Sequence, residues 1–391
     1  MQKQAGHKTE RLPILIVFDE QAPFKDTYAG EIGRIALTAY LIRPVDKPSK
    51  TVAVFMHPIG GGAYLPMINA LGKAGVHVVS CDSRYRGTDV ALIMEKVVID
   101  LNACIRELKQ KYHYEKVILG GWSGGGSLSL FFQAEAEHPT VRHTPAGEPP
   151  DLTQQGLVAA DGIMLIAAHL ARHRTLTQWL DASVMDEDNP ENRIRELDLY
   201  DPANPNQPPY TASFLEKYAQ AQIERNRRIT RRVRAKLEEF RGRGEMNREY
   251  SFVVHRTMAD PRWLDPAVDP NDRQPNWCFL GDPKVVNESP IGLARFCSLR
   301  SWLSQWSYDD ANGDGIACAA RISIPALVIG NTGDDGITPS HTHQLFKAIG
   351  HDNKELHWIQ GANHYYFQQP DKAAESAALC ADWLKRKNLA D

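Results

Sequence analysis

The sequence has no long apolar run and no large charge imbalance, and we expect no leader segment. No window reaches the roughly 18 uninterrupted apolar residues that a membrane-spanning helix needs, so we expect no membrane span. A formal net charge of only −3 at pH 7 argues against a nucleic-acid-binding protein, because phosphate neutralisation needs a basic face. Residues 1–12 have no apolar core and no small-residue cleavage site, so the sequence predicts no signal peptide and a cytoplasmic location.

Motifs for metal binding are also missing. The six cysteines are scattered without C-x-x-C or zinc-like spacing, which is typical of small core residues in a reducing compartment. Residues 310–315 resemble the opening of a calcium loop, but the twelfth position is Arg321 rather than an acidic ligand. His341 and His343 alternate at an expected helix start, where a solvated pair is the commoner arrangement. We therefore expect no metal site.

The sequence shows an alternation of expected strands and helices with one long interruption. Short apolar runs rich in β-branched residues alternate with helix-like stretches over residues 12–169 and again after residue 320, which indicates a mostly parallel sheet. Between residues 170 and 319 the rhythm stops, and proline-rich tracts flank a helix-like run over residues 214–243. The sequence predicts a core in two parts, residues 1–169 and 320–391, with a mainly helical insertion over residues 170–319. The expected strands are 13–18, 35–42, 51–56, 76–81, 115–119, 162–167, 324–329 and 355–359.

The most informative motif is Gly-Trp-Ser-Gly-Gly at residues 121–125, between an expected buried strand and an apolar helix. A sharp turn from strand to helix forces its central residue into a strained conformation, and neighbours without Cβ atoms relieve the crowding. Ser123 would then stand at the N-terminus of a helix, where free amides favour developing negative charge. The strand, turn and helix together favour a nucleophilic Ser123 over a simple glycine-rich turn.

A serine nucleophile needs a base, and the base needs a group that holds its tautomer. Both are offered after the insertion. The strand at 324–329 is followed by a loop that presents Asp334 and Asp335, and the last expected strand is followed by His364. Because the carboxyl ends of parallel strands share one edge of a sheet, we expect these side chains to meet Ser123 there.

With these motifs in the order Ser, Asp, His, the chain resembles the serine hydrolases of the α/β-hydrolase fold. The resemblance implies a mostly parallel eight-stranded sheet with helices on both faces and a cap inserted after strand six. Family members commonly carry Asp-x-x-x-Pro after the seventh strand, and counting back from Pro339 gives Asp335 as the acid partner of His364. Asp334 is the alternative, because one extra residue after Gly330 shifts the usual count.

The resemblance also implies an oxyanion hole made of two backbone amides. One is the amide of Gly124, after the nucleophile, and the other belongs to the glycine-rich loop after the third strand. In that loop Pro58 has no N–H, so the donor is expected to be Ile59 or Gly60.

The function expected from this resemblance is cleavage of a carboxylic ester through an acyl-enzyme, with no cofactor. Carbon–carbon bond hydrolysis, amide cleavage and lactone opening by the same residues stay open, and a non-catalytic binding module is a further alternative. Trp122, Tyr64 and Tyr365 adjoin the motif residues and are expected to contact a small-molecule ester. Five of the eight tryptophans lie in the insertion, so a cap over the site would favour bulky apolar or aromatic substrates. A homodimer is compatible with the sequence.

Overall fold

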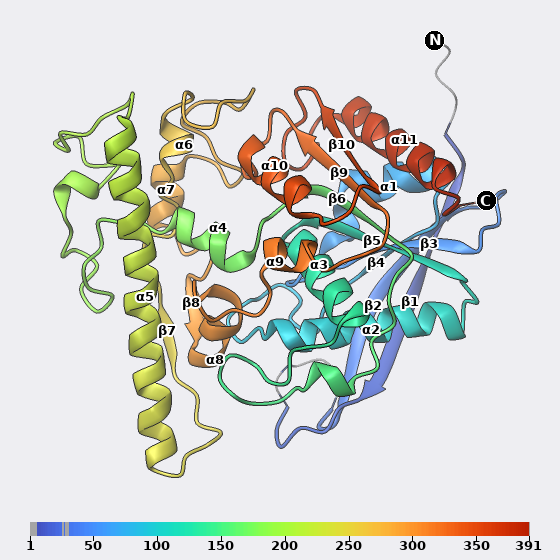
Figure 1. The fold of residues 1–391 in the computed structure, drawn as a ribbon, viewed down its shortest axis with the longest axis horizontal. Coiled ribbons are helices and arrows are strands. Elements are labelled where there is room, and N and C mark those ends of the chain that lie inside the picture. Colours follow the sequence, from blue (N-terminus) through green and yellow to red (C-terminus); the bar gives the residue numbers. More distant parts are fainter. Residues whose placement is uncertain (1–5, 26, 28–30, 391) are drawn as a thin grey trace.

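An eight-stranded sheet forms the centre of the computed structural model, which describes residues 6–25, 27 and 31–390. Residues 1–5 of the segment searched for a signal peptide lie outside the described residues. The strand order is β1-β2-β4-β3-β5-β6-β9-β10 (Figure 1). The pairs β1·β2 and β2·β4 are antiparallel and the others are parallel, so the mostly parallel sheet that the sequence predicts is confirmed. The strands are β1 Thr9–Asp19, β2 Arg34–Pro44, β3 Thr51–Phe55, β4 Val78–Cys81, β5 Lys116–Ser123, β6 Gly162–Ala168, β9 Ala326–Asn331 and β10 Lys354–Ile359.

Helices cover both faces of this sheet, which explains why the central strands β3, β4, β6 and β9 are buried along their whole length. Successive residues of β3 point to opposite faces: Val54 packs into the core layer under α2, α3 and α10, whereas Phe55 packs into the layer under α1 and α11. The core helices are α1 Pro66–Lys73, α2 Met94–Gln110, α3 Gly124–Glu137, α9 Gly315–Ala319, α10 Pro339–Ala348 and α11 Pro370–Arg386. The core therefore has two apolar layers with the sheet between them.

The insertion leaves the sheet after β6 and returns at β9, as expected, and is mainly helical (Figure 1). Its helices are α4 Arg172–Trp179, α5 Ala212–Gly242, α6 Pro261–Leu264, α7 Pro283–Glu288 and α8 Leu299–Ser301, followed by a π-helix at Trp302–Trp306. It also holds a short antiparallel pair, β7 Ser251–Val253 and β8 Phe296–Ser298, which the sequence did not predict. Short 3-10 helices lie at Gly62–Tyr64, Leu152–Gln154 and Arg195–Leu197.

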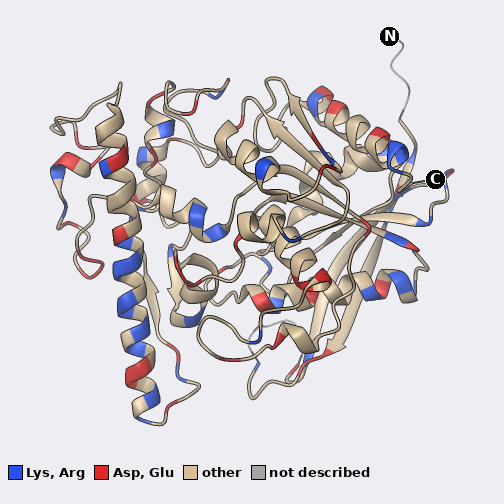
Figure 2. Cartoon of the chain, viewed as in Figure 1, with Lys and Arg blue, Asp and Glu red and all other residues tan. Residues whose placement is uncertain are grey.

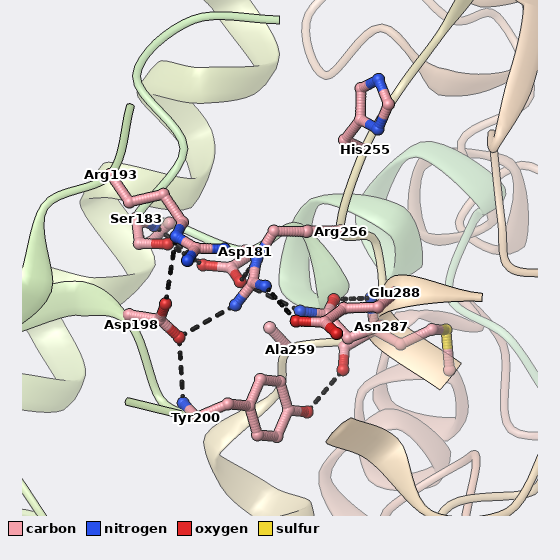
Figure 3. Close-up of polar contacts among 12 residues, drawn as sticks. Asp181, Ser183, Arg193, Asp198, Tyr200, His255, Arg256, Ala259, Asn287 and Glu288 are labelled. Atoms are coloured by element: carbon pink, nitrogen blue, oxygen red, sulfur yellow. Dashed lines mark hydrogen bonds and ion pairs between the residues drawn. The ribbon is translucent and has the colours of Figure 1, made fainter. Parts of the chain in front are cut away.

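Buried ion pairs hold the insertion together. The guanidinium of Arg256 pairs with Asp181 at 2.6 Å, with Asp198 at 2.9 Å and with Glu288 at 2.7 Å (Figure 3). Asp181 also accepts hydrogen bonds from the side chains of Ser183 and Asn287. Because donors and acceptors in this cluster satisfy one another, the cluster fixes the chain course of the insertion.

The basic residues of α5 appear as a series of blue bands along this helix in Figure 2. They are balanced by acidic partners: Arg227 pairs with Asp309, Arg232 with Asp188, and Arg234 with Asp310. These surface pairs are typical of a solvated helix face. Within the described ranges, no helix is both long enough and apolar enough to cross a membrane.

Candidate active site

Ser123 stands at a sharp turn where β5 ends and α3 begins. Its backbone has φ +52° and ψ −127°, a strained conformation for a residue with a side chain. The turn closes because its neighbours are glycines. A Cβ atom on Gly121 would lie 2.6 Å from the Cα of Gly126, and one on Gly126 would lie 2.4 Å from the Cβ of Ala168. The glycines are therefore needed for the close contact of β5, β6 and α3 that presents Ser123.

The structure brings Ser123 and His364 together, as the sequence predicts. The Nε2 atom of His364 lies 3.1 Å from the Oγ atom of Ser123, and both side chains are buried. The other ring nitrogen, Nδ1, lies 3.0 Å from each carboxylate oxygen of Asp334. Ser123 at the end of β5, Asp334 in the loop after β9 and His364 in the loop after β10 thus form one continuous hydrogen-bonded series. This series lies at the carboxyl edge of the sheet.

The expectation that Asp335 pairs with His364 is wrong, because the partner is Asp334. The backbone N–H of Asp334 donates to the carbonyl of Asn331 in a tight turn, and this turn directs the Asp334 side chain inward. There its Oδ1 atom also accepts the backbone N–H groups of Gly336 and Ile337, at 2.8 and 2.6 Å. The imidazole of His364 is hydrogen-bonded to Asp334 rather than to Asp335. The carbonyl of Asp335 accepts the indole N–H of Trp263 in the insertion.

The two adjacent carboxylates differ in their electrostatic surroundings. Burial tends to lower the pKa of His364, but the charge of Asp334 and its hydrogen bond outweigh burial and raise that pKa above its usual value. Burial, together with the negative charge of Asp334, raises the pKa of Asp335 to about 6. Asp334 therefore stabilises a positive charge on His364. For Asp335, in contrast, the surroundings disfavour the ionised form of the carboxyl group.

The loop amides expected in the oxyanion hole are engaged within their own loop. The N–H of Ile59 donates to the Nδ1 atom of His57 at 3.3 Å, and the N–H of Gly60 donates to the carbonyl of His57 at 2.7 Å. Pro58 and the positive φ of Gly60, +67°, form the tight turn that directs both amides back to His57. The expectation for Gly124 is compatible with the structure, since the first N–H of α3 has no partner inside the helix.

Ser123 opens into a pocket of about 260 Å³. The three residues expected to contact substrate, Trp122, Tyr64 and Tyr365, all line this pocket. Trp122 also supports the histidine loop, because its indole N–H donates to the carbonyl of His364 at 3.2 Å. The insertion contributes a large part of the pocket wall, namely Arg172, Phe279, Leu280, Ile291, Gly292, Leu293 and Trp306.

Several of the lining residues had no role in the sequence analysis, among them His57, His169, Arg172 and Phe279. His57 belongs to the loop that the sequence analysis identified, and a signal for it existed in its position directly after the third strand. His169 follows β6, where its backbone N–H donates to the carbonyl of Ser123 at 3.0 Å. Arg172 and Phe279 lie in the insertion, where no periodic pattern indicates which side chains point inward. None of the described residues form a cluster of three or more His, Cys, Asp or Glu side chains suited to a metal ion.

The chain is similar to one protein family and to several solved structures. A family model described as "Alpha/beta hydrolase family" matches residues 53–376. A monoacylglycerol lipase from Paleococcus ferrophilus has 17% sequence identity and a TM-score of 0.45, over 89% of this chain and 98% of that one. A carboxyl esterase from Bacillus coagulans has 11% identity and a TM-score of 0.48, over 95% of this chain and 98% of that one. No curated protein matches the sequence.

Proposed function

Because this chain belongs to the alpha/beta hydrolase family, we propose that it hydrolyses a carboxylic ester with Ser123 as the nucleophile. The observation that carries the proposal is the buried series Ser123, His364, Asp334, with contacts of 3.1 and 3.0 Å. A nucleophile, a base within hydrogen-bonding distance and a carboxylate that orients the base are the parts that acyl transfer requires.

In the first half of the reaction, the Oγ atom of Ser123 attacks the ester carbonyl carbon while its proton moves to Nε2 of His364. The electron pair of the carbonyl π bond moves to the carbonyl oxygen and gives a tetrahedral oxyanion, which the N–H of Gly124 stabilises. When the intermediate collapses, the bond to the leaving alkoxide breaks, and the alkoxide takes the proton from His364. The products are a free alcohol and an acyl-enzyme on Ser123.

In the second half, water attacks the acyl carbon and gives its proton to His364. Collapse of this second intermediate returns the electron pair to the Oγ atom of Ser123, which recovers a proton from His364 as the carboxylic acid leaves. Asp334 keeps the Nδ1–H of His364 in place and stabilises the imidazolium that forms in each half. No cofactor takes part in these steps.

The apolar wall of the pocket supports a substrate with a bulky apolar or aromatic group. The ring of Phe279 lies 5.7 Å from the ring of His364, and Leu280, Ile291 and Leu293 extend the same wall. Because these side chains come from the insertion, the insertion would act as a lid that excludes water and selects the acyl or alcohol group.

A panel of chromogenic esters tests the proposal, with the wild-type protein and Ser123→Ala compared on each ester. We expect turnover by the wild type and a loss of at least ~10³-fold in kcat for Ser123→Ala with its thermal stability retained. A matched control is Ser129→Ala, which removes a buried serine further along α3. Equal turnover by the wild type and Ser123→Ala, or no turnover of any ester in the panel, would overturn the proposal.

A further inference from the structure

The oxyanion site has fewer backbone donors than ester hydrolysis normally uses. Such sites commonly bind the oxyanion with two or more donors. Here the N–H groups of Ile59 and Gly60 both point to acceptors on His57, at 3.3 and 2.7 Å. The N–H of Gly124 is then the one backbone donor of the expected three that is left for the oxyanion, so other donors must lie near it.

The side chain of His57 presents such a donor. Because Nδ1 accepts the N–H of Ile59, the neutral ring carries its proton on Nε2. A Cβ atom on Gly124 would lie 2.8 Å from this Nε2 atom, so the imidazole N–H stands directly beside the residue that supplies the backbone donor. Burial, with the charges of Arg172 and His364, lowers the pKa of His57 to about 3. The ring is therefore neutral at physiological pH and keeps one fixed N–H.

Arg172 of α4 approaches the same point from the insertion. Arg172 lines the pocket, and its Nη1 atom would lie 3.4 Å from a Cβ on Gly124. The rest of the guanidinium is fixed: Nε donates to Gln305 at 3.0 Å, Nη2 donates to Asp89 at 3.3 Å, and the group stacks over Trp306 at 4.2 Å. A fixed cation needs no reorganisation when negative charge develops beside it.

The charges around Arg172 favour a transient anion over a permanently anionic substrate. Asp89 lies in the same pocket and already offsets the charge of Arg172. A substrate carboxylate would therefore meet Asp89 as well as the guanidinium throughout binding, whereas the oxyanion forms only as the tetrahedral intermediate is reached and receives both fixed donors there.

We infer that His57 and Arg172 are side-chain members of the oxyanion hole, donating beside the N–H of Gly124. This inference rests on the proposed ester hydrolysis at Ser123 and assigns the donors that complete its site. The alternative is a structural role, in which His57 shapes its loop and Arg172 braces the insertion against Asp89. The two roles differ in one measurable property, because an oxyanion donor stabilises tetrahedral adducts more than it stabilises bound substrate.

The test compares wild type, His57→Phe, His57→Gln, Arg172→Gln and the double variant Asp89→Asn/Arg172→Gln. His57→Phe keeps an aromatic ring without a donor, His57→Gln restores an N–H, and the double variant avoids a buried unpaired carboxylate. For each protein, kcat and KM are measured on one neutral aryl ester, and the inhibition constant is measured for a trifluoromethyl ketone, which forms a tetrahedral oxyanion adduct with a serine. The matched controls are His77→Gln and Arg174→Gln. His77 lies just before β4 and contacts Tyr114, and Arg174 lies on α4 and pairs with Asp314.

We expect kcat to fall ~10²–10³-fold in His57→Phe and ~10-fold or more in Arg172→Gln, with KM within about threefold of the wild type. Affinity for the trifluoromethyl ketone should fall in parallel with kcat, and His57→Gln should recover part of both. The inference would be overturned if kcat and the ketone inhibition constant stayed within about threefold of the wild type in both the double variant and a folded His57→Phe. Equal losses of affinity for the substrate and for the ketone would also overturn it. If His57→Phe does not fold, the double variant decides. If Ser123→Ala is inactive while the His57 and Arg172 variants keep wild-type activity, only this inference is rejected. If Ser123→Ala is active, the proposed function is rejected.

Discussion

At the scale of single residues, the site depends on which of two adjacent carboxylates turns inward. Sequence alone predicted the groups that the structure brings together, Ser123, His364 and one of the two aspartates, because each lies at or after the carboxyl end of an expected strand. It did not select the correct acid, since counting back from Pro339 assumes a standard loop. In the structure, the turn from Asn331 places Asp334 against His364 and leaves Asp335 at the insertion. A turn that directs Asp334 rather than Asp335 inward is therefore enough to exchange the roles of these two side chains.

Replacement of Asp334 tests this assignment. Asp334→Asn should lower kcat by ~10³–10⁴-fold, because the amide would donate to Nδ1 of His364 and hold the wrong tautomer. Asp335→Asn should stay within about tenfold of the wild type, since the imidazole of His364 is hydrogen-bonded to Asp334 and not to Asp335. Steady-state kinetics on one ester measures both, and a larger loss in Asp335→Asn would contradict the assignment.

The raised pKa of Asp335 predicts a pH-dependent stability effect. The unfolded carboxyl titrates near 3.9, whereas burial and the charge of Asp334 raise the pKa in the folded protein to about 6. Between these values the folded state binds more protons than the unfolded state, so the free energy of unfolding falls as pH rises and stays reduced above pH 6. Asp335→Asn removes this titration, so its Tm relative to the wild type should rise between pH 4 and pH 7. The exposed Asp352→Asn is the control, and a difference in Tm that is the same at every pH would count against the claim.

At the scale of elements, local sequence predicted most of the architecture because the central strands are buried on both faces and are mostly apolar. The long helix α5, Ala212–Gly242, also lies close to its expected span of 214–243. The strands β7 and β8 escaped prediction because three residues carry no alternating pattern, and their pairing partners are more than 40 residues apart. A local sequence pattern cannot predict that two short segments far apart in the chain will pair.

The contact between α3 and β6 at the nucleophile turn predicts a steric effect. Gly126→Ala would place a Cβ atom 2.4 Å from the Cβ of Ala168, so we expect a loss of about 1–3 kcal/mol in the free energy of unfolding. Gly242→Ala is the matched control. No atom lies within 4 Å of the added Cβ at this last residue of α5, and the change should be neutral or stabilise by up to about 1 kcal/mol. Urea denaturation measures both, and an equally stable Gly126→Ala would contradict the packing argument.

At the scale of the whole molecule, the core supplies the reactive groups and the insertion supplies much of the wall around them. This division could be anticipated from the interruption of the strand and helix rhythm. The identity of the lining residues could not, because Phe279 and Ile291 lie in proline-rich, aperiodic segments whose side-chain directions depend on the folded insertion. The same holds for Arg172, whose place beside Gly124 depends on how α4 packs against the core.

Phe279 offers the most direct test of the lid. Phe279→Ala should lower kcat/KM for a bulky aryl ester by ~10-fold or more, because an apolar contact in the pocket is lost, and should leave acetate esters within about threefold. Val285→Ala, an exposed residue of α7, is the control outside the pocket. Equal losses on small and bulky esters would indicate damage to the site rather than a role in selectivity.

The central claim, that a serine at the turn between β5 and α3 becomes covalently acylated, is tested most directly by mapping a covalent adduct. The protein is treated with a fluorophosphonate, digested, and examined by peptide mass spectrometry. The account predicts one phosphonylated residue, Ser123, with labelling abolished in Ser123→Ala and strongly slowed in His364→Ala. An adduct on Ser127 or any other residue, or undiminished labelling of Ser123→Ala, would contradict it.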